Sequence, residues 1–438
     1  MSAPDDRSES DALLVLATGA RAHERPALLW AFVQFFCVLA AYYLLRPVRD
    51  QFSAAVGSTN LWQFWTATFF VTLALVPVFG ALVARYPREK FIPAVYLFFI
   101  LCLVAFVPAF DAQERIGARM LGIVFYIWLS VFSLCVVSVF WSFMADVFDS
   151  AQARRLFPVI AIGGTLGAIV GPIVAGLLPI HVLLIAAIGL LAVAIACTWR
   201  LSAWSRQHPN LQHRNENAHD VIGGGMFDGL KQVFRSPFLR RMIALLLLGD
   251  AVGTIAYALS ADVIKAHAAT GEARKTIYAH IDLATNVLQL LLQVGVTRLL
   301  MSRYGVVAAL VADGALKAVV LLAAALVGTP AMVVAMLIVT RASAYGIGKP
   351  ASDSLYARAE RETRYKGKNV IDTAGWRFGD VVVSLSMKGL TAFGVGVAGF
   401  ALISTFAAAL SGWFGWRAAH APELLSEQTG SIDATNDE

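Results

Sequence analysis

Apolar runs of about 20 residues recur along nearly the whole chain. A helix of about 20 residues crosses a hydrocarbon core about 30 Å thick, so each run is long enough for one span. Charged residues make up 15% of the sequence, whereas soluble domains hold about 25%. The predicted spans are 27–49, 61–83, 91–110, 119–145, 156–178, 180–199, 239–262, 278–302, 305–327, 330–356, 370–392 and 396–416. We therefore expect an all-α membrane protein with about twelve transmembrane helices.

Lysine and arginine gather in alternate short connections between the spans. Arg85, Arg88 and Lys90 lie between the second and third spans, and a larger basic group lies within 358–368, between the tenth and eleventh. Cytoplasmic loops are enriched in these residues, so both termini are expected in the cytoplasm. The segment before Arg25 lacks the short apolar core of a signal peptide. These features predict a multi-pass protein of the cell inner membrane, whose first span directs insertion.

One long polar connection, 200–238, divides the chain. We interpret it as a cytoplasmic linker between an N-terminal six-helix half, 27–199, and a C-terminal six-helix half, 239–416. A cytoplasmic segment, 1–26, precedes the first half. The acidic polar tail, 417–438, is expected to be disordered and cytoplasmic.

The two halves echo each other after their second spans. In both 80–90 and 295–305, a glycine is followed by spaced basic residues. Two six-helix repeats joined by a long inner loop resemble the major facilitator architecture. The segment 80–90 is similar to that superfamily's loop signature, but it lacks the acidic residue before the first arginine and has Pro87 where glycine is usual.

Three further stretches resemble the ATP/ADP antiporters, the nucleotide exchangers of bacteria and plastids. They are YYLLRPVRD at 42–50, VVSVFWSFMAD at 136–146 with its continuation through Pro158 to Gly167, and RYKGKNVID at 364–372. The resemblance implies a divergent antiporter in the major facilitator superfamily. It also implies that Arg49 and a lysine of the pair Lys366 and Lys368 bind substrate phosphates.

The sequence departs from this family at two places. Leu129, Ser130 and Ser133 stand where nucleotide-exchanging members carry a glutamate. The eleventh span contains Trp376-Arg377-Phe-Gly-Asp380, a pattern associated with divergent relatives of unassigned substrate. The resemblance therefore bears on the fold more directly than on ATP/ADP exchange.

Cations within apolar spans are the main candidates for a solute site, because a charge at mid-bilayer costs about 2.5–3.5 kcal/mol. Tyr42, Arg46 and Arg49 share one face at the outer end of the first span. Arg341 lies near mid-depth of the tenth, with Tyr345 and Lys349 following at steps of four. The eleventh carries Arg377 and Lys388 on a stripe with Thr373, Asp380 and Ser384. The predicted substrate-binding residues are Arg46, Arg49, Arg341, Tyr345, Lys366, Lys368, Arg377 and Lys388.

These cations outnumber the acids considered with them, Asp250, Asp282 and Asp380, which indicates an anionic solute. The arginines also have structural alternatives. Arg46 and Arg49 can snorkel to the outer interface, with Asp50 neutralising Arg49, and Arg341 can pair with Asp250 or Asp282. Arg377 can pair with Asp380, which leaves Lys388 less compensated.

The acids and the inner loop are candidates for gating or coupling. Asp146 and Asp149 lie near Arg154 and Arg155, where we expect either a gate that breaks during transport or a static surface network. The residues assigned to gating or coupling are Asp146, Arg154, Arg155, Asp250, Asp282 and Asp380.

Other polar positions favour structural roles. The stripe Asp282, Asn286, Gln289 and Gln293 suits helix contacts or hydrogen bonds to a base or sugar. Asp313 and Lys317 are four apart on the ninth span and predict an ion pair. Gly163, Gly167 and Gly171 would let a neighbouring helix approach the fifth span closely.

No HExxH, GxSxG, CxxC or GxxxxGK[ST] motif occurs, so we expect neither an enzyme nor a metal or cofactor site. The predicted function is secondary-active transport of an anionic, phosphorylated solute by alternating access, with nucleotide exchange favoured by resemblance. The expected partners are that solute and membrane lipid, without nucleic acid, and the protein is expected to be a monomer or weak oligomer. The alternatives are a proton-coupled organic-anion transporter and a non-transporting membrane scaffold or lipid-handling protein.

Overall fold

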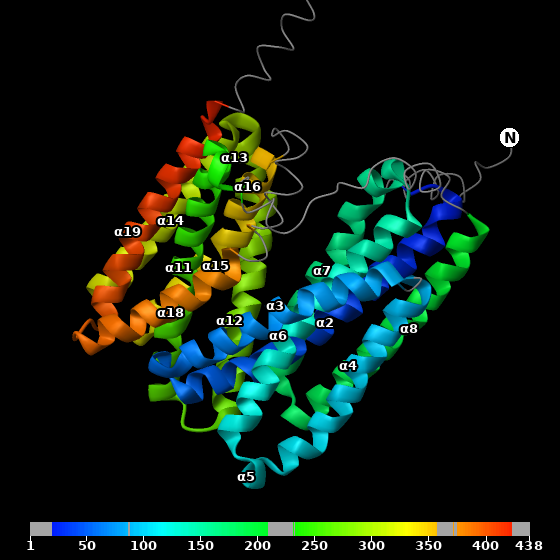
Figure 1. Ribbon diagram of the computed structural model, residues 1–438, viewed down its shortest axis with the longest axis horizontal. Coiled ribbons are helices and arrows are strands. Elements are labelled where there is room, and N and C mark those ends of the chain that lie inside the picture. Colours follow the sequence, from blue (N-terminus) through cyan, green and yellow to red (C-terminus); the bar gives the residue numbers. More distant parts are fainter. Residues whose placement is uncertain are drawn as a thin grey trace, which may run out of the picture. The chain divides into compact units, whose positions relative to one another are not determined.

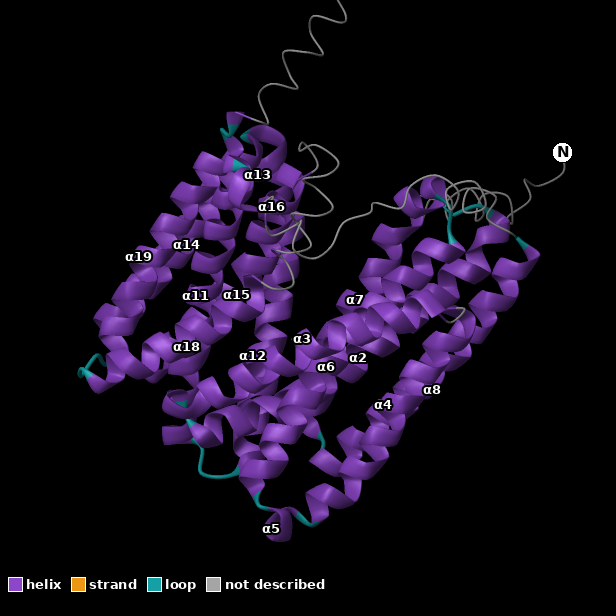
Figure 2. Cartoon of the chain, viewed as in Figure 1, coloured by secondary structure: helices purple, strands orange, loops and turns teal. Residues whose placement is uncertain are grey.

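The computed structural model describes residues 20–85, 88–208, 231, 233–356, 371 and 375–422. In that part of the chain every regular element is a helix and no strand occurs (Figure 2). Ten of the described helices are long and apolar enough to cross a membrane. They occupy ten of the twelve predicted spans. The other two predicted ranges, 61–83 and 370–392, overlap the helices α3 (Leu61–Arg85) and α18 (Trp376–Ala392).

The N-terminal half of the sequence forms helices that follow one another with short connections (Figure 1). A 3₁₀ turn, η1, precedes the first long helix, the turn η2 follows it, and α5 is a single short turn before α6. The elements are η1 (Ala22–Glu24), α2 (Arg25–Val56), η2 (Ser58–Asn60), α3 (Leu61–Arg85), α4 (Arg88–Asp111), α5 (Gln113–Ile116), α6 (Ala118–Val147), α7 (Ser150–Leu177) and α8 (Ile180–Gln207).

In the C-terminal half, two of the long helices contain a π-helical stretch. The turn η3 interrupts the eighth predicted span and η4 interrupts the tenth. The elements are α11 (Pro237–His267), α12 (Gly271–Leu291), η3 (Leu292–Thr297), α13 (Arg298–Arg303), α14 (Gly305–Val327), α15 (Pro330–Ser343), η4 (Ala344–Gly348), α16 (Lys349–Tyr356), α18 (Trp376–Ala392) and α19 (Val397–Ala419).

Local sequence explains where several of these helices begin and end. Ser236 accepts a hydrogen bond from the Leu239 amide at 3.2 Å, and Pro237 occupies the first position of α11. Both features suit a helix N-terminus, where the first amides lack intrahelical partners. At the other end of a helix, Gly328 adopts φ 65° after α14, a left-handed conformation that glycine takes without strain.

Small residues allow α7 to approach α2 closely, as the glycine spacing predicted. A Cβ at Gly167 would lie 2.4 Å from the Phe36 carbonyl oxygen, and one at Gly163 would lie 2.6 Å from that of Phe32. At Gly171 it would meet the Tyr43 Cβ at 2.8 Å. The expected packing role of this glycine repeat is therefore confirmed.

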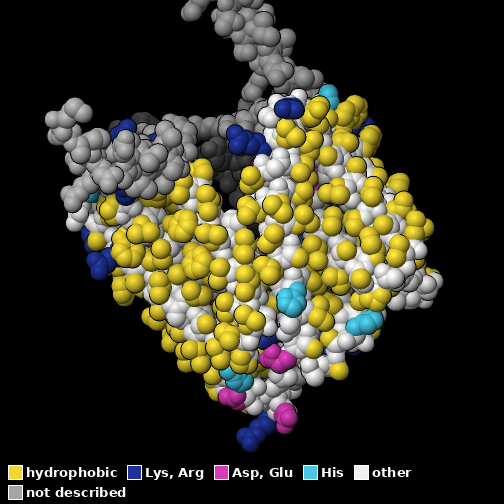
Figure 3. Space-filling view, turned by 180° about the vertical axis from the view of Figure 1, so that it is seen from behind, with side chains coloured by type: hydrophobic (Ala, Val, Ile, Leu, Met, Phe, Trp, Pro, Cys, Tyr) yellow, Lys and Arg dark blue, Asp and Glu magenta, His cyan; other side chains and the backbone are white. Residues whose placement is uncertain are grey.

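Apolar side chains cover most of the face drawn in Figure 3, where charged side chains are few. Leu177 and Leu326 are each 77% exposed and Phe406 is 70% exposed. Large apolar side chains facing outward from apolar helices are expected where lipid, not water, surrounds the protein. The chain is a multi-pass membrane protein.

The chain divides into two compact units. The first contains Met1–Phe52, Ala74–Ile222 and Lys275–Leu283; the second contains Ser53–Leu73, Gly223–Arg274 and Ala284–Glu438. The first unit therefore includes part of α12, while the second includes the end of α2 and the beginning of α3. Within the first unit α4 runs beside α8, and within the second α14 runs beside α19 (Figure 1). The predicted boundaries of the two six-helix halves and of the flanking segments stay predictions.

Candidate solute site

Arg49 of α2 forms a tight ion pair inside the first unit. Its Nε donates to Asp50 Oδ1 at 2.8 Å, and its Nη2 lies 2.7 Å from the same oxygen. Asp50 is fully buried, and the Arg49 guanidinium lies 4.9 Å from the ring centroid of Tyr126 on α6. This pair is the neutralisation of Arg49 by Asp50 that the sequence offered as an alternative to solute binding. The role of Arg49 as a phosphate ligand stays a prediction.

Arg46 of the same helix is held differently. Its Nε lies 3.7 Å from Asp50 Oδ2 and 3.7 Å from Asp282 Oδ2, beyond the ~3.2 Å limit of a good N–H···O hydrogen bond. That nitrogen is buried and donates no hydrogen bond to any described residue. The guanidinium carbon lies 5.9 and 5.6 Å from the ring centroids of Tyr42 and Tyr43. Charge and aromatic rings surround this cation, whereas its Nε lacks a directional partner among the described residues.

The acids beside these arginines change the expected charge balance. Arg46 and Arg49 face two carboxylates, Asp50 and Asp282, both fully buried. The positive charge of these two arginines is therefore matched within the first unit, as the alternative of neutralisation by Asp50 allowed for Arg49. The sequence count placed Asp282 with Arg341 and left Asp50 out. Helical register alone does not show that α12 turns Asp282 toward Arg46.

The segment Lys275–Leu283 of α12 belongs to the first unit, and it makes a second contact there besides that of Asp282. The buried Lys275 ammonium donates to the Leu178 carbonyl, just beyond the end of α7. A cation at a helix C-terminus is favourable because the last carbonyls lack partners and the helix dipole is negative there. Lys275 was not singled out by sequence.

In the second unit, the acids Asp250 and Asp380 both lie where α11 meets α18. Asp380 accepts a hydrogen bond from Thr254 Oγ1 at 2.9 Å. A Cβ at Gly379 would lie 2.5 Å from Asp250 Oδ2, so glycine at this position of α18 makes room for that carboxylate. Thr254 was not singled out by sequence. A hydroxyl four residues after Asp250 on the same helix was the available signal.

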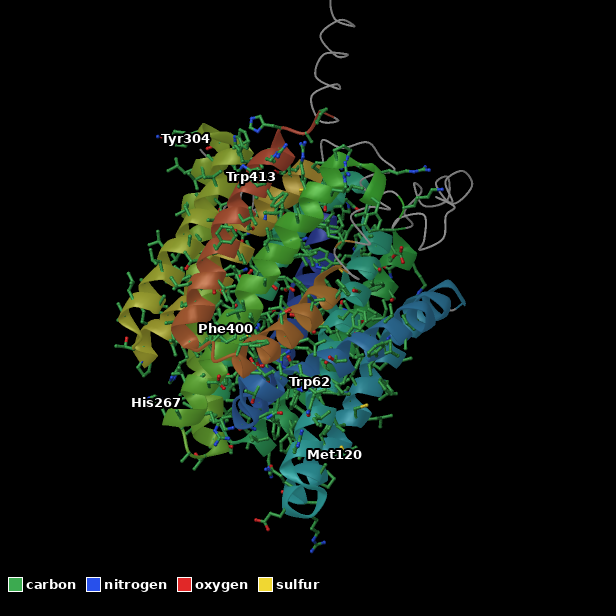
Figure 4. All side chains as sticks on the ribbon, turned by 60° about the vertical axis from the view of Figure 1, so that its left-hand side comes forward. Trp62, Met120, His267, Tyr304, Phe400 and Trp413 are labelled. Carbon is green, nitrogen blue, oxygen red and sulfur yellow. The ribbon has the colours of Figure 1, made fainter. Side chains whose placement is uncertain are left out.

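The remaining predicted cations have separate surroundings. The exposed Lys388 ammonium lies 4.4 Å from the ring centroid of Trp62. Trp62, labelled in Figure 4, lies at the beginning of α3. Arg341 is half-buried on α15, and Tyr345 lies in the π turn η4 with 45% exposure. Lys349 lies 3.2 Å from Asp353 on α16. The π turn means that Arg341, Tyr345 and Lys349 do not follow the regular α-helical stripe expected from steps of four.

At the predicted inner end, Arg155 pairs with a residue that the sequence did not single out. Glu24 is 1% exposed and accepts from Arg155 Nη2 at 3.0 Å, from Gln152 Nε2 at 3.0 Å and from the Arg21 amide at 2.8 Å. Asp149 accepts from the Gln152 amide at 2.7 Å and so caps α7. Asp146 is half-buried on α6. The gating roles of Asp146 and Arg155 stay predictions.

Several predicted residues lie outside the described part of the structure. Lys366 and Lys368 fall in an undescribed range, and the side chains of Arg154 and Arg377 are not described. No group of three or more His, Cys, Asp or Glu residues suited to a metal occurs among the described residues. The predicted pair on α14 is confirmed, because Lys317 Nζ donates to Asp313 Oδ2 at 2.6 Å.

Comparison with solved structures shows that nearly the whole chain shares its fold with known membrane transporters. A D-xylose–proton symporter matches with a TM-score of 0.62 and 12% identity over 91% of this chain and 98% of its own. The POT family transporter PepTSo matches with a TM-score of 0.61 and 13% identity over 90% and 98%. The nucleoside transporter NupG matches with a TM-score of 0.59 and 14% identity over 91% and 99%.

Sequence comparison gives a distant relationship. ADP,ATP carrier protein 3 of Rickettsia prowazekii (strain Madrid E) is 22% identical over 165 residues, which cover 32% of this chain and 33% of the relative. The protein of the same description from Rickettsia felis matches over the same shares with the same identity. The match thus spans about a third of the length of these curated relatives. No family model matches the chain.

The helical architecture and these structural matches show that the chain has the major facilitator fold, the fold of the transporters named above. One third of the chain is similar in sequence to the ADP,ATP carrier proteins, in agreement with the resemblance noted in its motifs. The relatives and structural neighbours named above are all transporters, which supports the expectation that the chain is not an enzyme.

Proposed function

We propose that this protein exchanges an anionic, phosphorylated solute across the membrane by alternating access, with a nucleotide as the favoured solute. Arg46 is the principal anion ligand in this proposal. The observation that carries it is the state of the Arg46 guanidinium, whose buried Nε has charged neighbours at 3.7 Å but no hydrogen-bond acceptor among the described residues.

An anionic oxygen would supply what Arg46 lacks. Arginine presents planar donors that match phosphate and carboxylate oxygens, and charge-assisted hydrogen bonds of this kind are the stronger ones. The Arg46 side chain is 15% exposed, so the low surrounding dielectric strengthens the attraction. Arg49 is already engaged by Asp50 at hydrogen-bond distance, and its displacement costs more.

Binding at Arg46 is coupled to the position of α12 by simple charge balance. The two arginines and two carboxylates around Arg46 are matched, so an entering anion brings excess negative charge. The like charge of Asp282 then favours separation of Asp282 from Arg46. Movement of α12 on solute binding supports alternating access. Without solute the Arg46–Asp282 pair opposes this movement, so the empty carrier does not change conformation, as an exchanger requires.

The choice of nucleotide rests on sequence. The three stretches that resemble ATP/ADP antiporters include the arginines of α2, and the curated match is to ADP/ATP carriers. Arg341, Tyr345, Lys366, Lys368, Arg377 and Lys388 remain proposed contributors to solute binding. The cation distribution favours an inner-membrane protein with both termini in the cytoplasm. A monomer or weak oligomer is the proposed assembly.

Exchange by purified protein in liposomes tests the function. Wild-type protein should take up labelled ATP or ADP only when unlabelled nucleotide is present inside. Arg46→Ala should weaken apparent affinity by about 10- to 100-fold, the loss expected for hydrogen bonds to a charged group worth about 1.5–3 kcal/mol. Arg46→Lys should retain part of it. Arg115→Ala, at an exposed position of α5, is the matched control.

Two other outcomes would replace this proposal. Uptake of an organic anion driven by a pH gradient, without internal nucleotide, would favour a proton-coupled transporter. The position of Asp250 and Asp380 at the contact of α11 and α18 makes them its proton-carrying candidates. No flux of any anion in protein that remains folded would favour the scaffold or lipid-handling role.

A further inference from the structure

The helix that carries Arg341 is interrupted by a π turn that other helices hold on two sides. The turn η4 lies between α15 and α16 and contains Tyr345. One residue of an α-helix corresponds to about 100° of rotation, so an added residue changes the face that following side chains occupy. π turns of this kind are rare and occur frequently at functional sites.

On one side, η4 is bonded to the second π turn. Thr297 of η3 is buried and its Oγ1 donates to the Gly346 carbonyl of η4 at 2.6 Å. Thr297 thus supplies a hydrogen bond from another turn to a backbone carbonyl of η4. Gly346 also packs closely, since a Cβ there would lie 3.0 Å from the Gln289 carbonyl oxygen.

On the other side, η4 rests against a buried ion pair of α14. Asp313 and Lys317 are 6% and 4% exposed, and their charged atoms lie 2.6 Å apart. A Cβ at Gly348 would lie 2.7 Å from Asp313 Oδ2, the oxygen that Lys317 holds. Asp313 Oδ1 is buried without a hydrogen-bond partner among the described residues.

Burying the Asp313–Lys317 ion pair is energetically costly compared with filling the same volume with apolar side chains. Burying two charges costs desolvation that their attraction often fails to recover, and apolar residues of similar volume are often as stabilising or more so. The unsatisfied oxygen of Asp313 adds to that cost. A role in packing alone therefore does not explain a pair that contacts η4.

We propose that the Asp313–Lys317 pair is a positioning element: it holds the π turn η4 and thereby sets where Arg341 and Tyr345 lie. The pair acts through η4 and does not touch the solute. This inference rests on the proposed function only where transport is the readout. The buried carboxylate, the glycine beside it and the Thr297 hydrogen bond form one continuous support for the turn.

The test replaces the pair by apolar residues. Asp313→Leu/Lys317→Leu should leave the protein inserted and its melting temperature nearly unchanged. It should raise the apparent KM for nucleotide by about tenfold with little change in Vmax, because misplacement of a positioned group by ~1 Å has effects of this size or larger. Gly348→Ala should act in the same direction, since its Cβ meets Asp313.

Matched controls separate this effect from general disturbance of helices. Gly189→Ala adds a Cβ to α8 where no atom lies within 4 Å, and it should leave KM unchanged. Thr405→Val removes a hydroxyl bonded within α19, whereas Thr297→Val removes the bond to η4. Only the Thr297 variant should raise KM.

A second readout needs no solute. Tyr345→Cys in a cysteine-free background reports the exposure of η4 through its rate of reaction with a water-soluble maleimide. The apolar pair should change this rate, while Gly189→Ala should not. If wild-type protein exchanges no nucleotide but the labelling rate changes, the proposed function fails and the positioning role stands. Unchanged KM and labelling in the apolar variant would overturn the positioning role.

Discussion

Arg46 Nε lies 3.7 Å from Asp282 Oδ2, and this ion pair joins α2 to a segment of α12 within one compact unit. The two residues come from the first and eighth predicted spans. Nothing in their local sequences predicts that they meet. Their pairing makes Asp282 a competitor for any anion that binds Arg46, and it links the occupancy of the proposed site to the position of a helix.

Removing the competing charge should strengthen anion binding. We expect Asp282→Asn to lower the apparent KM for nucleotide by about tenfold, because like charge beside the site opposes the solute. It should also allow flux without nucleotide on the opposite side, since the empty carrier loses the pair that opposes its return. Counterflow measurements with and without internal nucleotide check both effects.

The control for this prediction is Asp111→Asn, at an exposed carboxylate that pairs with His181. That variant should transport like the wild type. A rise in KM for Asp282→Asn, with flux still dependent on internal nucleotide, would contradict the competition between Asp282 and the solute.

The two arginines of α2 should differ in their contribution to stability. Arg49→Ala leaves the fully buried Asp50 without its hydrogen-bonded cation, a type of change that costs about 3–5 kcal/mol. Arg46→Ala removes contacts at 3.7 Å and should lower stability less. Thermal unfolding of detergent-purified protein, followed by thiol-reactive fluorescence, measures the difference. Equal losses in the two variants would mean that Arg46 is as firmly paired as Arg49.

Close packing of α2 and α7 should depend on glycine. Gly167→Ala introduces a Cβ only 2.4 Å from the Phe36 carbonyl oxygen, so the helices must separate. Overpacking of this kind costs about 1–3 kcal/mol, and the melting temperature should fall. Gly189→Ala serves as the control because its added Cβ has open space. If both variants melt alike, the two backbones are not in close contact at Gly167.

Local sequence predicts some contacts between and within the helices, and it does not predict the charge balance of the candidate site. The glycine repeat at Gly163, Gly167 and Gly171 predicted a close helix contact, because its four-residue spacing is a local property. The Asp313–Lys317 pair was predicted for the same reason. The charge balance around Arg46 was not, because it depends on which face α12 turns toward α2.

The π turns are a second feature that local sequence does not predict. Steps of four from Arg341 through Tyr345 to Lys349 predict one helical stripe, and an apolar sequence does not distinguish an α turn from a π turn. In the structure, η4 is stabilised from outside its own helix by Thr297 and is packed against Asp313. Contacts between helices decide the local backbone there.

The order of apolar runs and their lengths were enough to specify a bundle of membrane helices, because bilayer thickness and the need to satisfy every backbone group act on each segment separately. Which acid meets which arginine, and where a helix widens into a π turn, depend on the rotation and register of helices far apart in the chain. Those quantities arise only when the helices pack, so only the tertiary structure assigned Asp282 to Arg46 and placed Asp313 against Gly348.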